Sequence, residues 1–209
     1  MTRNQLHGKK FEDLIKACGL FSGSADGGRT VIAKFDIEAR FDKNLGLPTS
    51  IKSTGSDTVG LSDARRFWGM DDDFRMIVGR YEQHGTIKTF SVVHEILLSN
   101  DDLRELRGNI SYKEVTDFHD GMSLNRFPAG HHDEARLWAQ QQKKILESQH
   151  SSVILNPKID SKSQRRLQCS IALPTLINIS ASQGRYTSHS EWIGDLKLPV
   201  QLNSSALEF

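Results

Sequence analysis

Apolar residues recur at two different spacings in the first part of the chain. Between Asn4 and Gly19 they follow the i, i+3, i+4, i+7 spacing of one helix face. Between Val31 and Phe41 they alternate with charged residues, which is typical of a half-buried strand. The pattern therefore predicts a helix followed by a strand. The positions that share the apolar helix face are Phe11, Leu14, Ile15 and Cys18.

Turn-forming residues occupy positions 42–46, and a proline then opens a second extended stretch. We therefore expect a hairpin. Strand side chains repeat every two residues, so Asp36 and Glu38 of the first strand would lie beside Ser50 and Lys52 of the second. Two carboxylates and a lysine on a strand pair are the groups that metal-assisted hydrolysis of a phosphodiester needs.

The rest of the chain alternates between expected strands and helices. Two strands are expected between Phe74 and Ser99, the second buried on both faces because its apolar run is nearly continuous. Segment 53–61 is expected to be a loop, 152–155 a short strand, and the tail from Ser180 irregular structure with a strand or two. Helices are expected at 63–68, 100–106, 112–118 and 131–148. These elements predict an α/β fold, with a central mixed β-sheet of about five strands flanked by helices and a small C-terminal lobe.

Composition adds bounds rather than a function. With 209 residues, 37% of them hydrophobic, the chain suits one globular domain, which we divide into a core at 1–110 and a second part at 111–209. A net charge of +1 neither indicates nor excludes a nucleic-acid partner. No apolar run is long enough for a bilayer and no signal region opens the chain, so we expect a cytoplasmic protein without a membrane partner. Cys18 and Cys169 match no zinc spacing and are expected to be reduced core thiols.

Several other polar residues have a plain structural interpretation. His94 is expected to be a core histidine, because no partner histidine lies at metal-ligand spacing. The adjacent His131 and His132 would point in different directions on a helix, which argues against a metal pair. Glu12 suits a solvated helix carboxylate, and Asp63 suits the positive end of a helix dipole. A role at a metal site stays open for both carboxylates.

The densest positive stretch of the chain lies late in the sequence. Between Lys158 and Arg166, four basic residues and one acidic residue give a net charge of +3. Serine, glutamine, lysine and arginine side chains bind phosphates and base edges, so the segment is a candidate DNA-binding element. An exposed polar loop is the alternative. The candidate DNA-binding residues are Lys158, Ser161, Lys162, Ser163, Gln164, Arg165, Arg166 and Gln168.

The order of these features resembles the core of the PD-(D/E)xK nucleases. In that family a helix glutamate comes first, an aspartate opens a hairpin, and an acid-x-lysine follows; here Glu12, Asp36 and Ser50-Ile51-Lys52 stand in that order. The separation between Asp36 and Lys52 is 52 − 36 = 16 residues. The resemblance covers roughly residues 5–70. It is closer to type II restriction endonucleases that read four-base sites, which also carry a polar, basic recognition segment late in the chain.

The resemblance implies a site-specific endonuclease that cleaves double-stranded DNA with Mg²⁺, acting as a monomer or homodimer. Asp36 and the Ile51 carbonyl would hold the metal, with Glu38 as a further ligand. Lys52 would orient and help deprotonate the attacking water, and Ser50 replaces the usual second acid. The carboxylates that could fill that place are Glu12, Glu38, Asp57 and Asp63.

Two other functions stay open. The chain could be a structure-selective repair or recombination nuclease built on the same core, which would cut branched DNA regardless of sequence. It could also be a DNA-binding protein without catalysis, because Ser50 stands where the family has a metal ligand.

Overall fold

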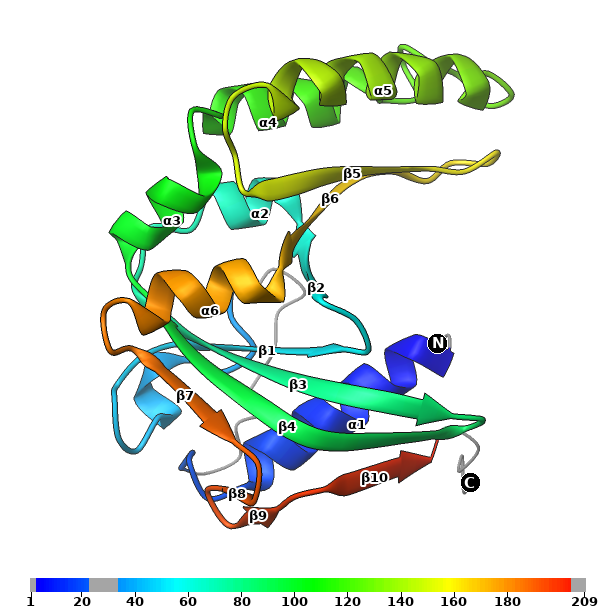
Figure 1. The fold of residues 1–209 in the computed structure, drawn as a ribbon. Helices are drawn as coiled ribbons and strands as arrows, with labels where there is room; N and C mark the ends of the chain where they lie inside the picture. The colour runs from blue at the N-terminus through cyan, green and yellow to red at the C-terminus, as the bar shows by residue number, and fades with distance from the viewer. Residues whose placement is uncertain (1–2, 23–33, 204–209) are drawn as a thin grey trace. The chain divides into compact units, whose positions relative to one another are not determined.

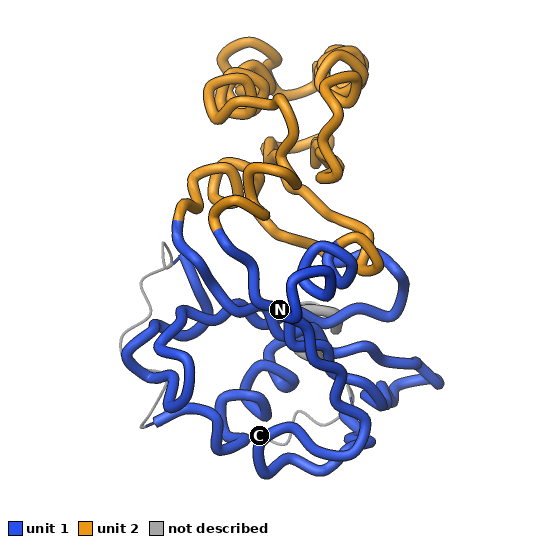
Figure 2. The backbone as a smooth tube through the Cα atoms, turned by 60° about the vertical axis from the view of Figure 1, so that its left-hand side comes forward, with its two compact units in different colours: residues 1–59, 72–99, 176–209 blue, residues 60–71, 100–175 orange. Residues whose placement is uncertain are grey.

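The structure is a computed structural model that describes residues 3–22 and 34–203. The fold is α/β, with a mixed, curled central sheet flanked by helices (Figure 1), as the sequence predicts. The chain forms two compact units (Figure 2). The first unit comprises residues 1–59, 72–99 and 176–209, and the second comprises residues 60–71 and 100–175. This division differs from the expected boundary at residue 110, because both units are assembled from separate segments of the chain.

The first unit contains the central five-stranded sheet. Strand order is β1-β3-β4-β10, and β7 pairs with the same strand, β4, as β10 does. Strand β1 runs parallel to β3, whereas the remaining pairs are antiparallel, so the sheet is mixed. The strands are β1 (Thr49–Thr54), β3 (Phe74–His84), β4 (Ile87–Leu98), β7 (Tyr186–His189) and β10 (Val200–Asn203). Strands β3 and β4 confirm the two strands predicted between Phe74 and Ser99.

Helix α1 (Arg3–Ala17) packs on one face of this sheet. Its apolar residues Phe11 and Ile15 are fully buried, as the helical spacing predicts. The Phe11 ring stacks on that of Phe90, with centroids 4.4 Å apart, and lies where a side chain at Gly79 would stand. The close approach of α1 to β3 therefore depends on a glycine. Figure 1 shows helix α6 (Leu173–Ala181) on the opposite face from α1.

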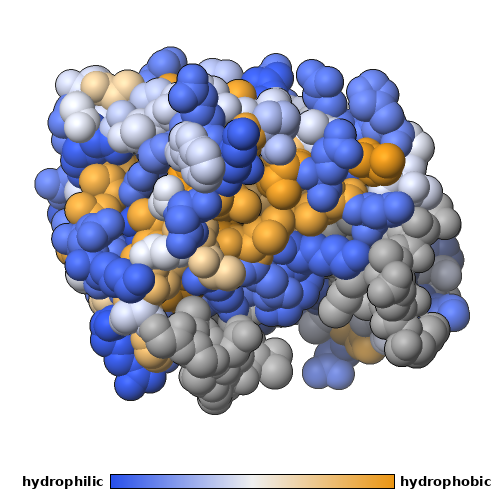
Figure 3. Space-filling view, turned by 90° about the horizontal axis from the view of Figure 1, so that it is seen from below, coloured by the Kyte–Doolittle hydropathy of each residue, from blue (hydrophilic) through white to orange (hydrophobic). Residues whose placement is uncertain are grey.

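The C-terminal strands complete the first unit. Strands β8 (Trp192–Ile193) and β9 (Leu196–Lys197) form a separate small sheet, while β7 and β10 join the central one. Val200 and Leu202 pack partly buried against the core cluster that surrounds Phe11. Figure 3 shows the surface that lies below in Figure 1, where apolar side chains gather in the middle and are bordered by polar ones. The described part of the tail, which was expected to be irregular with a strand or two, thus forms four short strands.

The second unit is built around a three-stranded sheet of order β2-β6-β5. Trp68 is buried in this unit and its indole N–H donates to the Ile110 carbonyl at 2.8 Å. The Arg107 guanidinium donates to the carbonyls of Phe67 and Met70, which ties two helices together. The strands are β2 (Thr58–Asp63), β5 (Val153–Ile159) and β6 (Arg165–Ala172). The helices are α2 (Ala64–Trp68), α3 (Asn100–Arg107), α4 (Tyr112–Gly121) and α5 (His132–Glu147).

Some expected elements are wrong. The alternation between Val31 and Phe41 does not form a strand in its described part: residues 34–36 bend, Ile37 forms one isolated bridge, and 39–41 form a short 3₁₀ helix (η1, Ala39–Phe41). Positions 31–33 lie outside the described residues. The expected loop at 53–61 contains strand β2, whose alternate residues Val59 and Leu61 are buried.

His94 and the two cysteines lie in the core, as expected. His94 is a buried histidine whose Nδ1 lies 2.9 Å from the Tyr186 hydroxyl, and burial and the charge of Arg80 lower its pKa. Cys18 and Cys169 are buried free thiols. Among the described helices, none combines the length and the apolar character that crossing a membrane requires.

Candidate active site

Asp36 lies at the outer edge of β1, the end strand of the central sheet in the described residues. The backbone of Ile37 exchanges two hydrogen bonds with Thr49, at 3.0 and 2.8 Å. At the next position along β1, the Asp36 carboxylate takes the place of a backbone partner, because its Oδ2 accepts the Ile51 N–H at 2.7 Å. One side chain therefore continues the hydrogen-bonding ladder of the strand edge.

The same carboxylate oxygen meets both polar side chains of the Ser50-x-Lys52 pattern. Lys52 Nζ lies 3.3 Å from Asp36 Oδ2, and Ser50 Oγ lies 3.4 Å from it. The side chains of Asp36 and Lys52 are 18% and 19% exposed, so the ion pair is sheltered but reachable from solvent. The structure thus brings together Asp36, Ser50, Ile51 and Lys52, although the described residues 34–41 do not form the first strand of the predicted hairpin.

The Ile51 carbonyl shares this edge. Within a strand, the N–H and C=O of one residue point to the same side, and the Ile51 N–H points to Asp36 rather than to β3. The Ile51 carbonyl consequently points to the Asp36 side as well. A carboxylate, a carbonyl and a hydroxyl of consecutive strand positions are all oxygen donors, and a lysine lies beside them.

The local sequence explains this arrangement. The Ile51 side chain belongs to the core cluster with Phe11 and Ile15 of α1. Because strand side chains alternate, Ser50 and Lys52 point to the face opposite α1. Ser50 is buried there, whereas Lys52 stands at the strand edge. An apolar residue between two polar ones therefore anchors the strand while it directs the polar pair to one side.

The predicted second acids lie elsewhere. The Glu12 carboxylate is held by two lysines of its own helix, Lys16 at 2.9 Å and Lys9 at 3.6 Å. The Glu38 side chain is 62% exposed and pairs with Arg40 at 3.0 Å. These contacts place neither carboxylate against Lys52.

The other two candidates also have structural partners. Asp57 is 68% exposed and pairs with Arg80 at 2.9 Å. Asp63 is the N-cap of α2 and accepts the Arg66 N–H at 3.0 Å, so it has a structural role at the start of that helix.

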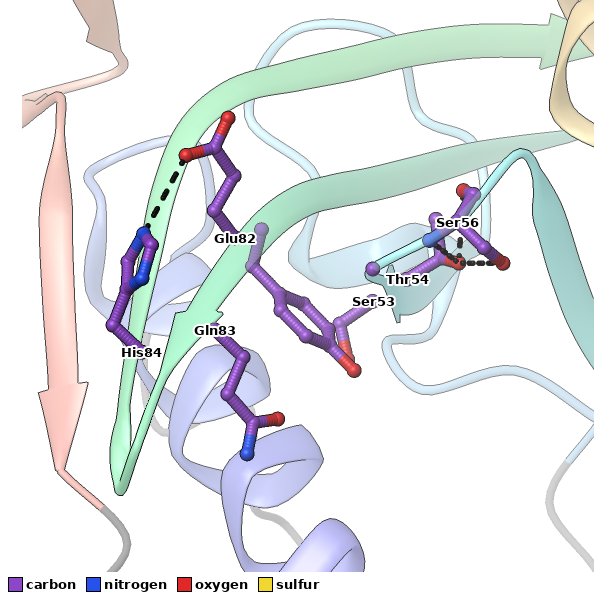
Figure 4. Close-up of a pocket in the computed structure, with 8 residues that line it drawn as sticks. Ser53, Thr54, Ser56, Glu82, Gln83 and His84 are labelled. Atoms are coloured by element: carbon purple, nitrogen blue, oxygen red, sulfur yellow. Dashed lines mark hydrogen bonds and ion pairs between the residues drawn. The ribbon is translucent and has the colours of Figure 1, made fainter.

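Two hollows adjoin the candidate site along the chain. One, of about 650 Å³, is lined in part by Lys34, Phe35, Glu38 and Asp72, so Glu38 faces a hollow that does not include Asp36. The other, of about 670 Å³, begins at Ser53, one residue beyond Lys52. Figure 4 shows its hydroxyl-bearing wall at the end of β1 and in the turn that follows, and its opposite wall at the end of β3, where His84 Nε2 lies 3.9 Å from a Glu82 carboxylate oxygen. Its lining residues are Ser53, Thr54, Gly55, Ser56, Tyr81, Glu82, Gln83 and His84.

The donor set at Asp36 suits a hard cation, although it is sparse. Nowhere in residues 3–22 and 34–203 do three histidine, cysteine, aspartate or glutamate side chains converge where they could hold a metal ion. Mg²⁺, however, is usually held by one or two carboxylates together with water and substrate phosphates. Asp36, the Ile51 carbonyl and Ser50 therefore fit a Mg²⁺ ion that is completed by substrate.

A buried charge network behind the site escaped the sequence analysis. Arg75 is 1% exposed, and its Nε donates to Thr49 Oγ1 at 3.1 Å, which fixes the start of β1. Its guanidinium also pairs with Asp42 at 2.9 Å and donates to Glu95 at 3.2 Å. The other Glu95 oxygen lies 3.0 Å from His189 Nε2. The one available signal was an arginine inside the apolar strand sequence FRMIV.

The predicted DNA-binding segment lies in the second unit and is mostly strand. It covers the end of β5, the connection 160–164 and the first half of β6. The loop alternative is therefore correct only for the connection. Arg165 is turned back onto the backbone, donating to the carbonyls of Asp160 and Gln164 at 3.0 and 2.9 Å. Lys158, Lys162 and Arg166 are exposed.

Comparisons with protein-family models, with curated proteins and with solved structures found no match. The functional inference consequently depends on the arrangement of the side chains.

Proposed function

We propose that this chain is a site-specific endonuclease that hydrolyses phosphodiester bonds of double-stranded DNA in the presence of Mg²⁺. The observation that carries the proposal is the convergence of Ser50, the Ile51 amide and Lys52 on one oxygen of Asp36. This places a lysine ammonium beside an oxygen-donor set at an accessible strand edge. The resemblance of the residue order to the PD-(D/E)xK pattern supports the same activity.

Each residue has a definite task in this proposal. Lys52, held by Asp36 at 3.3 Å, donates a hydrogen bond to the attacking water and favours its hydroxide form through its positive charge. Asp36 and the Ile51 carbonyl would hold Mg²⁺, and Ser50 would bind a water molecule of its shell. When bound, Mg²⁺ supplies Lewis-acid stabilisation of the charge that develops on the phosphate.

One observation favours a second candidate function, the binding of duplex DNA without cleavage. Among described residues, Asp36 is the single carboxylate within ion-pair distance of Lys52. Ser50 occupies the position of the second acid. A chain that has lost one metal ligand would keep its DNA contacts and lose its chemistry.

The test is digestion of a plasmid of known sequence by the purified full-length protein, followed by mapping of the fragment ends. We expect discrete ends with Mg²⁺ and none with EDTA. Lys52→Ala and Asp36→Asn should each lower the cleavage rate by about 10²- to 10⁴-fold, the usual contribution of a positioned proton-transfer group. The asparagine side chain of the second variant can still accept the Ile51 N–H, so this change removes charge while it keeps the edge bond.

The matched control is Lys197→Ala, which removes an exposed lysine of the same unit. It should cleave at the wild-type rate. The active-site assignment is falsified if Lys52→Ala also does so. Binding without cleavage at any divalent-metal concentration would establish the second candidate function, and cutting of branched junctions in preference to plain plasmid would indicate a structure-selective nuclease.

A further inference from the structure

The β5–β6 hairpin has one apolar face and an opposite face that is polar except for the exposed Ile154. Its buried positions are Val153, Leu155, Leu167, Cys169 and Ile171. On the opposite face, the strand register places polar residues in facing pairs: Lys158 opposite Arg166, and Asn156 opposite Gln168. Lys158 and Arg166 are exposed, and the amide pair is half-buried. The hairpin, called here the β5–β6 ribbon, thus carries a basic pair followed by an amide pair on two neighbouring strands, of which β6 also pairs with β2.

The basic pair is electrostatically unfavourable in the isolated protein. Like charges that face each other across an antiparallel pair destabilise it. Within residues 3–22 and 34–203, neither Lys158 nor Arg166 forms an ion pair with a carboxylate. The nearby acid, Asp160, is occupied by the backbone N–H groups of Lys162 and Gln164 at 2.9 and 2.7 Å. An anion bound between the two cations would remove their repulsion.

The amide pair has hydrogen-bonding capacity to spare. Asn156 Nδ2 donates to Ser170 Oγ at 2.8 Å and to the Ile154 carbonyl at 3.2 Å, which fixes the amide and leaves its oxygen as an acceptor. The Gln168 side chain makes no hydrogen bond to another described residue. Asparagine and glutamine amides can bond both the N6 and N7 positions of adenine.

The end of the ribbon is already fixed without a ligand. Arg165 closes the 160–164 connection through two backbone carbonyls, and Arg136 of α5 donates twice to the Ile159 carbonyl, at 3.2 and 3.1 Å. Arg165 therefore stabilises the turn between β5 and β6. A preordered ribbon loses little conformational entropy when it binds.

We propose that the polar face of the β5–β6 ribbon enters the major groove of duplex DNA, with Lys158 and Arg166 bound to backbone phosphate and Gln168 and Asn156 contacting base edges. The B-form major groove admits a two-stranded ribbon. Successive facing pairs stand two residues, or about 7 Å, apart along the strands, so one pair reaches the backbone while the next lies over the bases. The inference rests on the proposed function, because duplex DNA is the substrate there.

The first test measures binding of a labelled DNA duplex in EDTA over 50 to 200 mM salt, where phosphate contacts set the slope. The double variant Lys158→Ala/Arg166→Ala should flatten the slope of log K against log salt by about two units, since each phosphate contact contributes about one. The control Lys113→Ala/Lys144→Ala removes two exposed lysines of the same unit and should leave the slope unchanged. An unchanged slope in the first variant would overturn the proposal.

The second test enriches a pool of random duplexes by binding to the wild type and to Gln168→Ala. We expect the variant to discriminate less between preferred and scrambled sequences, by roughly 5- to 150-fold, which corresponds to one lost base contact. Identical sequence preferences would refute the base-reading role. Tighter binding to duplex RNA would overturn the proposal, because side chains cannot reach into the narrow major groove of A-form RNA.

These measurements contain no divalent metal and do not depend on cleavage. A chain that binds through the ribbon but never cuts would refute the nuclease proposal alone. A chain that cuts DNA, but whose DNA affinity is the same in the wild type and the ribbon variants, would refute only the proposal that the ribbon binds DNA.

Discussion

At the scale of single residues, Arg75 determines how β1 begins. A fully buried guanidinium needs partners on all sides, and here it has Thr49, Asp42 and Glu95, while its flat face lies 4.9 Å from the centre of the Phe21 ring. Removing one partner of a buried ion pair is costly, because the remaining charge stays desolvated. The network therefore fixes the strand that carries Ser50 and Lys52 without touching the candidate site.

Glu95 makes this network sensitive to acid. The hydrogen bond from His189 holds the pKa of Glu95 below its ordinary 4.5, and the Arg75 guanidinium adds to this effect, while burial opposes it. A carboxyl whose pKa is lowered by folding contributes stability above its unfolded pKa, and that contribution is lost as the pH falls through the folded pKa. Stability should therefore fall below about pH 4.5 partly through this group.

Glu95→Gln tests this linkage. Glutamine keeps the shape and most hydrogen-bonding capacity but cannot ionise, so the variant should be less stable by about 1–3 kcal/mol at neutral pH. Its free energy of unfolding should depend less on pH below 4.5 than that of the wild type. Urea unfolding at a series of pH values measures both. Parallel curves for the two proteins would show that Glu95 does not carry the linkage.

At the scale of elements, the packing of α1 on β3 depends on the missing side chain of Gly79. A Cβ there would lie 2.3 Å from the Phe11 ring, far inside contact distance. Gly79→Ala should therefore lower the free energy of unfolding by about 1–3 kcal/mol, the usual cost of overpacking a core. Thermal or urea unfolding measures the loss.

Gly8→Ala is the matched control, because a Cβ at Gly8 meets nothing within 4 Å and the residue lies inside α1. Alanine is the better helix former by about 1 kcal/mol, so this variant should be as stable as the wild type or more so. Two glycine-to-alanine changes would thus move stability in opposite directions. Equal effects would contradict the packing account.

Periodicity predicted the long elements well and failed where the chain crosses the edge of the sheet. Phe35 packs against Phe74, whereas Ile37 belongs to the cluster that contains Ile77. Phe74 and Ile77 are three positions apart on β3, so they point to opposite faces. Alternation had placed Phe35 and Ile37 on one face of a strand. The chain instead bends around the edge of β1, a tertiary arrangement that no local pattern encodes.

The structure brings together some of the predicted site residues, but by a different backbone arrangement. Asp36, Ser50 and Lys52 do meet, yet through a carboxylate that replaces a backbone partner and not through a hairpin. Glu38 lies two positions after Asp36, so a regular strand would place both side chains on one face. The bend instead directs the Glu38 side chain to Arg40 and to a hollow that does not include Asp36. Asp36 lies beside Ser50 and Lys52, as their spacing predicts, but an isolated bridge and a side-chain hydrogen bond bring them together instead of a hairpin.

At the scale of the whole molecule, each unit is assembled from segments that are distant in the sequence. Residues 60–68, which contain most of strand β2 and all of helix α2, supply a sheet edge and two buried aromatic side chains to the second unit. A division at residue 110 separates them from β6, with which β2 pairs. Sequence patterns predict elements one at a time, and contacts between distant segments are set by faces that become complementary only after folding.

The Asp36 carboxylate has a consequence for how copies of the chain behave toward one another. An end strand with open N–H and C=O groups invites a strand from another molecule, and natural proteins cover such edges to stay soluble. Here the backbone of Ile37 hydrogen-bonds the backbone of Thr49, and the Asp36 carboxylate accepts the Ile51 N–H. The residue proposed to hold the metal therefore also satisfies an edge N–H group that a strand of another molecule could otherwise bind.

Asp36→Ala should therefore self-associate at concentrations where the wild type and Asp36→Asn do not, because asparagine can still accept the Ile51 N–H and alanine cannot. Light scattering over a concentration series measures the difference. If both variants scatter alike, the edge is protected by other means. If they differ, position 36 needs a side chain that accepts the Ile51 N–H, and this requirement holds whether or not the protein cleaves DNA.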